Sequence, residues 1–136
     1  ALDAVLAAQE MISAIDSLSV LSLDRCGIPL KIGISINTGE AIVGNIGFSK
    51  KMEYTVIGDV VNQTFRLQDL TRSKPNSILI SESTHNQVKK SIRTRPYGLK
   101  KLDDALVNVY EVETEYSEQP SIVIDTSQGD SAAKIH

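Results

Sequence analysis

Two side chains in the middle of the chain, Asn62 and Arg66, have the residue types and the spacing of a pair that binds phosphate. Residues four positions apart on a helix lie on one face, so the two side chains would point the same way. The arginine guanidinium is a planar fork of donors that fits a phosphate or a carboxylate, and the asparagine adds an amide beside it. Thr55, at the end of a preceding strand, would lie near the start of this helix. Together the three residues can hold an anionic ligand.

Short patterns of this kind also arise by chance. An exposed Arg, an Asn near a helix start and a Thr in a strand are ordinary features, and the pattern alone favours that explanation. The supporting elements are a strand at residues 54–57, a break at Gly58 and Asp59, and a helix at residues 60–70. Asp59 is expected to be the N-cap of this helix, because its residue type is preferred there.

The rest of the sequence predicts a mixture of helices and strands. Residues 1–18 carry apolar residues at three- and four-residue steps, typical of an amphipathic helix. Residues 30–37 alternate apolar and polar positions, and an apolar run resumes at residues 41–46. A β-hairpin between these two segments is therefore expected, followed by a polar connection at residues 48–53.

Later segments complete this mixture. Ser81 or Ser83 is expected to cap a short helix that ends near Lys90. Strands are expected at residues 78–80, 92–97, 99–102 and 107–112, with turns at 73–77, 96–98 and 103–104. The pattern of elements indicates an α+β or α/β fold and does not choose between them.

Length and composition set limits on this interpretation. The 136 residues, 41% hydrophobic and 23% charged, have the composition of one soluble globular domain. The net charge of −3 comes from residues 114–136, which hold four acidic residues and one basic residue. The neutral remainder and the 4% aromatic content argue against nucleic-acid binding. No uninterrupted apolar run approaches a membrane span of about 20 residues, so no membrane contact is expected of this segment.

Several motifs in order resemble the catalytic domain of class III adenylate/guanylate cyclases. They are residues 33–40 (GISINTGE), 43–47 (VGNIG) and 54–59 (YTVIGD), followed by Asn62 and Arg66. The resemblance covers residues 1–113 and matches the C-terminal portion of such a domain. It implies an α+β fold with a ferredoxin-like sheet and helices, incomplete at the N-terminus, and a cytoplasmic location. Residues 114–136 are expected to be an acidic, flexible tail.

The resemblance also implies roles for four residues. Arg66 matches the arginine that stabilises the transition state, and Asn62 matches the asparagine that orients the ribose. Thr55 and the backbone of Val56 lie where the family reads the purine base, and a Thr there favours ATP. The implied function is that of an adenylate cyclase, which converts ATP to 3′,5′-cyclic AMP and pyrophosphate. Its sites would form in a homodimer or with a complementary cyclase half.

Two departures from the family pattern qualify this expectation. The family's metal-binding aspartates lie upstream of the matched portion, so the intact parent would use Mg²⁺ or Mn²⁺, while none is expected bound to this chain. We therefore expect the chain alone to be inactive. In addition, residues 102–105 (LDDA) have an Asp where many members carry a phosphate-binding Lys, although Asp103 and Asp104 also suit a simple turn. Lys100 or Lys101 would replace that Lys by a shift.

Two alternative functions stay open. In the first, the parent protein is a guanylate cyclase. In the second, the chain is a non-catalytic cyclase-like module for dimerisation or regulation. Separately, residues 89–101 carry six basic residues and no acidic one. They form either an anion-binding patch or a solvated strand face, and the neutral body favours the second. His85 and His136 are isolated, which gives no metal-ligand pattern.

Overall fold

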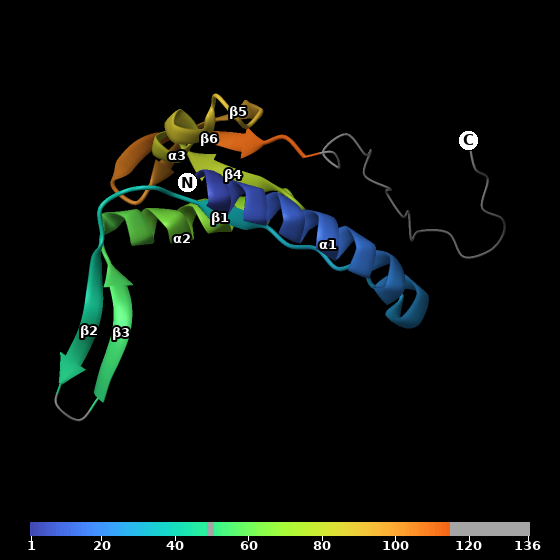
Figure 1. Cartoon of the computed structure of the whole chain (residues 1–136), viewed down its shortest axis with the longest axis horizontal. Coiled ribbons are helices and arrows are strands. Elements are labelled where there is room, and N and C mark those ends of the chain that lie inside the picture. Colours follow the sequence, from blue (N-terminus) through green and yellow to red (C-terminus); the bar gives the residue numbers. More distant parts are fainter. Residues whose placement is uncertain (49–50, 115–136) are drawn as a thin grey trace.

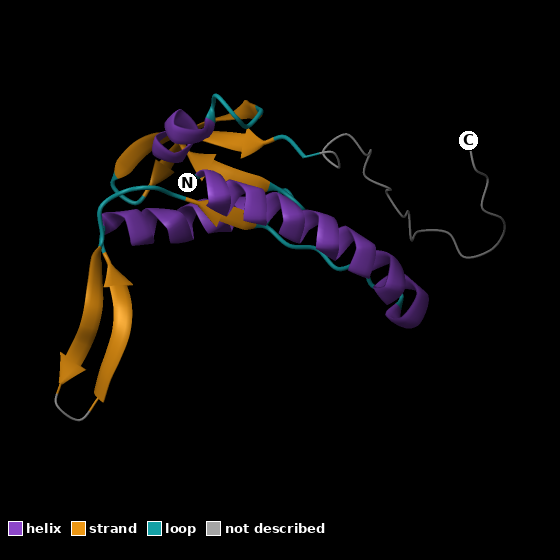
Figure 2. Ribbon diagram, in the orientation of Figure 1, coloured by secondary structure: helices purple, strands orange, loops and turns teal. Residues whose placement is uncertain are grey.

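The computed structural model describes residues 1–48 and 51–114 of the chain, with the elements labelled in Figure 1. The described part contains three helices and six strands, and Figure 2 shows how the two kinds of element are arranged. The predicted α+β class is confirmed. In chain order the elements are α1 (Leu2–Cys26), β1 (Ile34–Ile36), β2 (Ile42–Phe48), β3 (Lys51–Ile57), α2 (Asp59–Thr71), β4 (Ile78–Ser81), α3 (Glu82–Val88), β5 (Thr94–Leu102) and β6 (Ala105–Val112).

Four of the strands form a mixed sheet in the order β1-β4-β6-β5. β1 runs parallel to β4, with Ile34 opposite Ile78, and the other two pairings are antiparallel. The expected break at residues 96–98 is instead a register shift between Pro96 and Gly98 within the continuous strand β5. A proline cannot donate to the ladder, so a bulge lets the strand continue past it.

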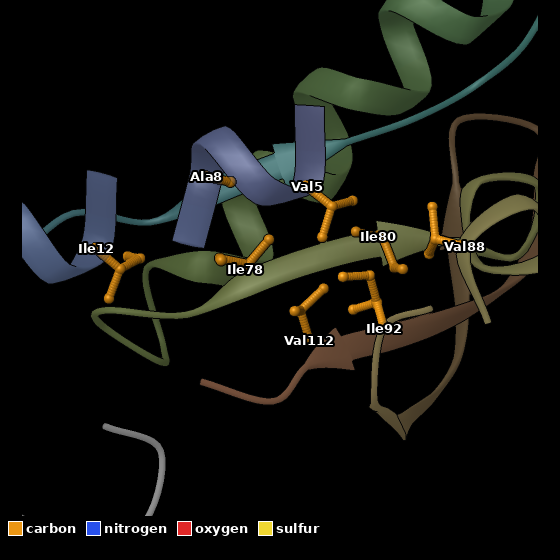
Figure 3. Close-up of a cluster of buried hydrophobic side chains, with 8 residues drawn as sticks. All are labelled: Val5, Ala8, Ile12, Ile78, Ile80, Val88, Ile92 and Val112. Carbon is orange, nitrogen blue, oxygen red and sulfur yellow. The ribbon is translucent and has the colours of Figure 1, made fainter. Parts of the chain in front are cut away.

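Alternating side chains of β4 pack against helices on both faces of the sheet. Ile78 and Ile80 are buried on the face that α1 and α3 cover, and Figure 3 shows them among buried residues of these helices and β6. Leu79, pointing the other way, packs with Leu67 of α2. Strand side chains alternate between faces, so three consecutive residues contribute to two separate cores. Each fully buried aliphatic side chain contributes about 1.5–3 kcal/mol.

The helix α1 is longer than the predicted 1–18. It continues to Cys26 and ends at Gly27, whose positive φ of 68° closes the helix with a hydrogen bond from its N–H to the Leu23 carbonyl. Val5, Ala8 and Ile12 are its buried residues, whereas Leu2 and Leu6 of the predicted stripe are largely exposed. Residues Leu2–Leu23 are long and apolar enough to cross a membrane by length and composition, which the count of uninterrupted apolar runs did not detect.

The predicted hairpin between residues 30–37 and 41–46 is wrong. β1 pairs with β4, and β2 pairs instead with β3 as a separate two-stranded sheet, so Phe48 and residues 51–53 of the expected connection lie in strands. The connection after β1 crosses the end of the sheet. There, Asn37 Nδ2 donates to the Val60 carbonyl at 3.1 Å, and Ser83 Oγ donates to the Thr38 carbonyl at 2.7 Å. These two hydrogen bonds attach the connection after β1 to α2 and α3. The β2–β3 hairpin that follows extends away from the other elements in Figure 1.

Helix starts follow the sequence with one correction. Ser81 caps α3 as predicted, since the Thr84 N–H donates to its Oγ at 3.4 Å. Asp59 is not the N-cap of α2. Gly58 takes that position, and Asp59 is the first helical residue without a side-chain capping bond. A carboxylate in the first turn still favours the helix through the helix dipole. Of the expected tail at residues 114–136, residues 115–136 lie outside the described residues.

Candidate active site

The helix α2 carries the predicted pair, and its opposite face is fixed to the sheet. Leu67 and Thr71 are buried there. Gln68 adds two bonds to the segment around β1: its Nε2 donates to the Gly33 carbonyl at 3.0 Å, and its Oε1 accepts from Ser35 Oγ at 2.9 Å. A Cβ on Gly33 would overlap the Thr71 hydroxyl, so this glycine permits the close approach of helix and strand. α2 is therefore a firmly positioned support.

Asn62 and Arg66 lie away from this packed face. Both are exposed, and the helical spacing places their side chains one turn apart on a common face. Neither side chain has a hydrogen-bond or ion-pair partner within residues 1–48 and 51–114. A guanidinium with no internal partner keeps its fork of donors available to a ligand. The structure thus brings Asn62 and Arg66 together as the sequence predicts.

Thr55 and Val56 lie on the hairpin, in β3. Thr55 is opposite Gly44 and Val56 opposite Val43 in the antiparallel ladder. Because neighbouring strand residues face opposite ways, the Thr55 side chain and the Val56 side chain cannot both face one ligand. A base reader at this point would use the Thr55 hydroxyl and the Val56 backbone. Gly58 links this strand to α2, but no hydrogen bond in the described part joins Thr55 or Val56 to Asn62 or Arg66.

The hairpin exposes an apolar surface that the sequence analysis did not identify as functional. Phe48, Tyr54 and Ile42 are 88%, 74% and 71% exposed, and Phe65 on the neighbouring helix α2 is 69% exposed. Exposed apolar side chains of this size, on both faces of one hairpin, favour contact with a partner. The available signal was apolar residues on both faces of the β2 and β3 strands, a pattern of strands covered on both sides.

The Asp103-Asp104 pair forms a turn between β5 and β6. Asp103 has a positive φ of 57°, and Leu102 before it is buried. This supports the expectation that Asp103 and Asp104 form a simple turn. Among the lysines just before it, Lys100 holds its Nζ 5.2 Å from the centroid of the Tyr97 ring, and Lys101 is exposed.

A buried acidic group lies on the α2 side of the sheet. Glu111 in β6 accepts from Arg95 Nε at 2.8 Å and also pairs with Lys74, which follows α2. Burial acts to raise the pKa of Glu111, but the hydrogen bonds from Arg95 and Lys74 outweigh it and hold that pKa below its ordinary value. The attraction of the same carboxylate raises the pKa of Arg95. Both cations are paired with this one carboxylate inside the protein, so the cluster is structural.

The fold and the position of the pair define a class: an α+β domain of the class III cyclase type. The family described as "Adenylate and Guanylate cyclase catalytic domain" matches residues 1–116, and the chain belongs to this family. Its resemblance to the cyclase catalytic domain and its fold class are thereby confirmed.

Individual relatives agree with the family. Adenylate cyclase 1 of Rhizobium meliloti is 32% identical over 110 residues, covering 79% of this chain, and the adenylate cyclase of Anabaena cylindrica is 29% identical over 121 residues, covering 82%. The matched parts are 16% and 24% of those proteins.

Two solved cyclase structures also match. The guanylyl cyclase Cya2 aligns with a TM-score of 0.71 and 29% identity, over 84% of this chain and 59% of that one. The adenylyl cyclase CyaB of P. aeruginosa aligns with a TM-score of 0.52 and 34% identity, over 62% of this chain and 43% of that one. These structures are cyclases of both nucleotide types, so the resemblance does not select ATP or GTP.

Cyclase domains of this family generally use divalent metal ions. Magnesium takes oxygen ligands, and its protein sites rest on carboxylates. Residues 1–48 and 51–114 contain no group of three or more His, Cys, Asp or Glu side chains that could hold a metal ion. The described residues therefore do not fit a complete metal site.

Proposed function

We propose that this chain supplies the ribose- and phosphate-contacting half of an adenylate cyclase site. The observation that carries the proposal is the pair Asn62 and Arg66: exposed, free of internal partners, and held one helical turn apart on a helix anchored to the sheet. This pair lies inside the segment that the cyclase family matches. A surface of this kind has no evident structural purpose, but it suits a nucleotide that arrives from outside the chain.

The chemistry would be the displacement of pyrophosphate from a nucleoside triphosphate. The ribose 3′-oxygen forms a bond to the α-phosphorus, and the bond from that phosphorus to the bridging oxygen of pyrophosphate breaks. Negative charge grows on the α-phosphate and the leaving group, where the Arg66 guanidinium would stabilise it. Asn62 would hold the ribose so that its 3′-oxygen points at phosphorus, a positioning contribution.

ATP is the proposed substrate because of Thr55. Its side chain is half-buried on β3, and its hydroxyl can accept a hydrogen bond from the exocyclic amine of adenine while the Val56 backbone lies beside the same edge. Guanylate cyclase activity is the second candidate, favoured by the guanylyl cyclase Cya2, which covers 84% of this chain. Turnover of ATP against GTP by an assembled enzyme separates these two candidates.

The site would be completed by a second chain, either another copy or a complementary cyclase half. Solved cyclase structures include dimeric forms and nucleotide complexes, which supports this in general. The exposed apolar hairpin gives this chain a surface for such a partner. Residues 1–113 would be the cyclase portion and residues 114–136 an acidic extension, and the domain would act in the cytoplasm.

We propose further that the 136-residue chain alone does not form cyclic AMP. The described residues hold no carboxylate cluster to bind the activating Mg²⁺ or Mn²⁺. A cyclase assay of the purified chain with either ion tests this, and robust cyclic AMP formation contradicts it. A partner that supplies the missing carboxylates should restore turnover.

The decisive experiment mixes this chain with the catalytic domain of a related cyclase. That domain keeps its metal-binding carboxylates, but its own residues aligned with Asn62 and Arg66 are changed to alanine. Cyclic AMP formation by the mixture then requires this chain's pair. Arg66→Ala is expected to lower the rate by about 10²–10³-fold. The matched control is Arg72→Ala at the C-cap of α2, whose exposed pairing with Asp69 at 3.5 Å contributes little.

Each outcome is informative. Activity that survives Arg66→Ala contradicts the role of Arg66. A mixed complex that forms but shows no activity with either variant or with the unchanged chain supports the third candidate, a non-catalytic dimerisation or regulatory module.

A further inference from the structure

The end of α3 and the start of β5 border an open cavity of about 500 Å³ that the proposed catalytic residues do not line. Its volume lies in the range of small-molecule sites. Its wall is mostly polar and basic and includes His85, Lys89, Lys90, Arg93, Thr94 and Glu113. The cavity belongs to the basic run at residues 89–101 that the sequence analysis left open between an anion site and a solvated face.

Charge in this cavity is unbalanced. Lys89, Lys90 and Arg93 face a single acid, Glu113, which leaves a net charge of +2 with His85 neutral. Lys89 Nζ donates to Asn86 Oδ1 at 3.1 Å. The side chains of Lys90 and Arg93 have no hydrogen bond or ion pair within the part of the chain that the structure describes.

The nearby cations on the sheet differ. Lys74 and Arg95 both pair with the buried carboxylate of Glu111. A solvated-face explanation accounts for Lys89, because a cation at the C-cap of α3 favours the helix dipole. The helix dipole gives no such reason for Arg93, which follows the turn after α3 and lines the same cavity. Three cations gathered around one cavity are better explained by an anionic occupant.

His85, which lines the cavity, is held in place by two contacts. The His85 ring stacks on Tyr110 with centroids 3.8 Å apart and planes 5° from parallel. Thr94 Oγ1 lies 2.9 Å from His85 Nδ1, which leaves Nε2 as the ring nitrogen without a partner among the described residues. Burial, and then the positive charge of Lys89, lower the pKa of His85, so its ring is neutral at neutral pH. A neutral ring held by two contacts can donate from Nε2 without adding charge.

We propose that this cavity is a binding site for a small phosphate-bearing anion, held by Lys89, Lys90 and the Arg93 fork with a hydrogen bond from His85. A phosphate is favoured over a carboxylate because its higher negative charge matches the surplus of cations, and its three oxygens serve donors from several directions. The site is separate from Asn62 and Arg66, so it serves regulation or a second ligand instead of the reacting triphosphate.

The chain has only two histidines, His85 and His136, so ring signals in a two-dimensional NMR spectrum give a local probe with an internal control. Sodium pyrophosphate, inorganic phosphate and AMP are titrated separately at constant ionic strength. We expect the His85 signals to shift and saturate with at least one of them, while the His136 signals do not. Saturation by AMP indicates a phosphomonoester site, whereas saturation by pyrophosphate or phosphate alone indicates a free-anion site.

Lys90→Gln combined with Arg93→Gln is expected to weaken this binding about tenfold or more, since charge-assisted hydrogen bonds are lost. The matched control, Arg25→Gln with Lys31→Gln, removes one exposed Arg and one exposed Lys elsewhere and should leave the affinity within about twofold. Arg66→Ala should also leave the His85 response intact, which separates this site from the proposed catalytic one.

Circular dichroism verifies that each variant is folded. The proposal is overturned if His85 signals stay fixed with all three ligands. It is also overturned if both double variants weaken the response equally, because the anion would then be attracted by overall charge.

Discussion

Ile80 in β4 and Ile42 in β2 are both isoleucines in strands, yet Ile80 is fully buried and Ile42 is 71% exposed. The difference separates two regions: the body, made of the four-stranded sheet with α1, α2 and α3, and the β2–β3 hairpin. In the body, the side chains of β4 pack against helices on both faces of the sheet. In the hairpin, apolar side chains on both faces meet no other element that buries them.

This contrast separates residues that stabilise the fold from residues available for partners. A hairpin of two strands has marginal stability by itself in water. Its strands remain paired along seven residue positions, from Ile42 opposite Ile57 to Phe48 opposite Lys51. A cyclase domain that completes its site with a second chain needs a surface of this type, and the hairpin lies next to the helix that carries Arg66. Three paired substitutions test whether the two regions differ in energy as they do in burial.

The largest difference is expected for truncation of a core side chain. Ile80→Ala should lower the free energy of unfolding by about 2–5 kcal/mol, because it leaves a cavity between α1, α3 and β6. Val43→Ala in the hairpin should cost less than about 1 kcal/mol, since Val43 is already exposed. Urea denaturation followed by circular dichroism, at a concentration where the chain is monomeric, measures both. Equal costs would mean that the hairpin packs against the body in solution.

A methyl group added at two glycines should give opposite signs. In Gly33→Ala the new Cβ collides with the buried Thr71 side chain, which should destabilise the chain by about 1–3 kcal/mol. In Gly44→Ala the new methyl meets nothing within 4 Å. Alanine loses less conformational freedom on folding than glycine, so this change should stabilise the hairpin by up to about 1 kcal/mol.

The same denaturation measurement includes a rescue of the first variant. Thr71→Ala combined with Gly33→Ala removes the colliding atoms, so the double variant should be less destabilised than the sum of the two single changes. An additive result would show that Gly33 and Thr71 are not in close contact.

These two regions also mark how far the sequence could be interpreted. Helix α2, strand β4 and the Ser81 cap follow from local patterns and were predicted, because caps and periodicity are determined within a few residues. The partner of β1 was mispredicted. Alternation at residues 30–37 shows that a strand exists, but its parallel partner β4 lies more than forty residues along the chain.

The candidate site divides in a similar way. Helical spacing was sufficient to place Asn62 and Arg66 on one face, since it depends only on local geometry. The exposure of Phe48 and Tyr54 could not be derived, because an apolar residue in a strand is ordinarily buried and only the tertiary structure shows otherwise. The cavity beside His85 joins α3, β5 and Glu113, so its basic residues had no visible common target in the sequence.

The smallest difference concerns two ion-paired glutamates. Glu111 pairs with Lys74 and Arg95 in the body, while Glu53 pairs with Lys51 at 3.1 Å on the exposed hairpin. Glu111→Gln should cost about 1–3 kcal/mol at neutral pH, and Glu53→Gln less than about 0.5 kcal/mol. Folding lowers the pKa of Glu111 below its ordinary value of 4.5. Its contribution is therefore complete above pH 4.5 and is lost as pH falls through the lowered pKa.

Urea denaturation between pH 3 and pH 7 measures this dependence. The stability gap between the unchanged chain and Glu111→Gln should shrink toward acid pH, while Glu53→Gln should follow the unchanged chain throughout. If the stability difference between the unchanged chain and Glu111→Gln stays constant across this range, the buried carboxylate gains nothing from its two cations. The body would then differ from the hairpin in hydrophobic burial alone.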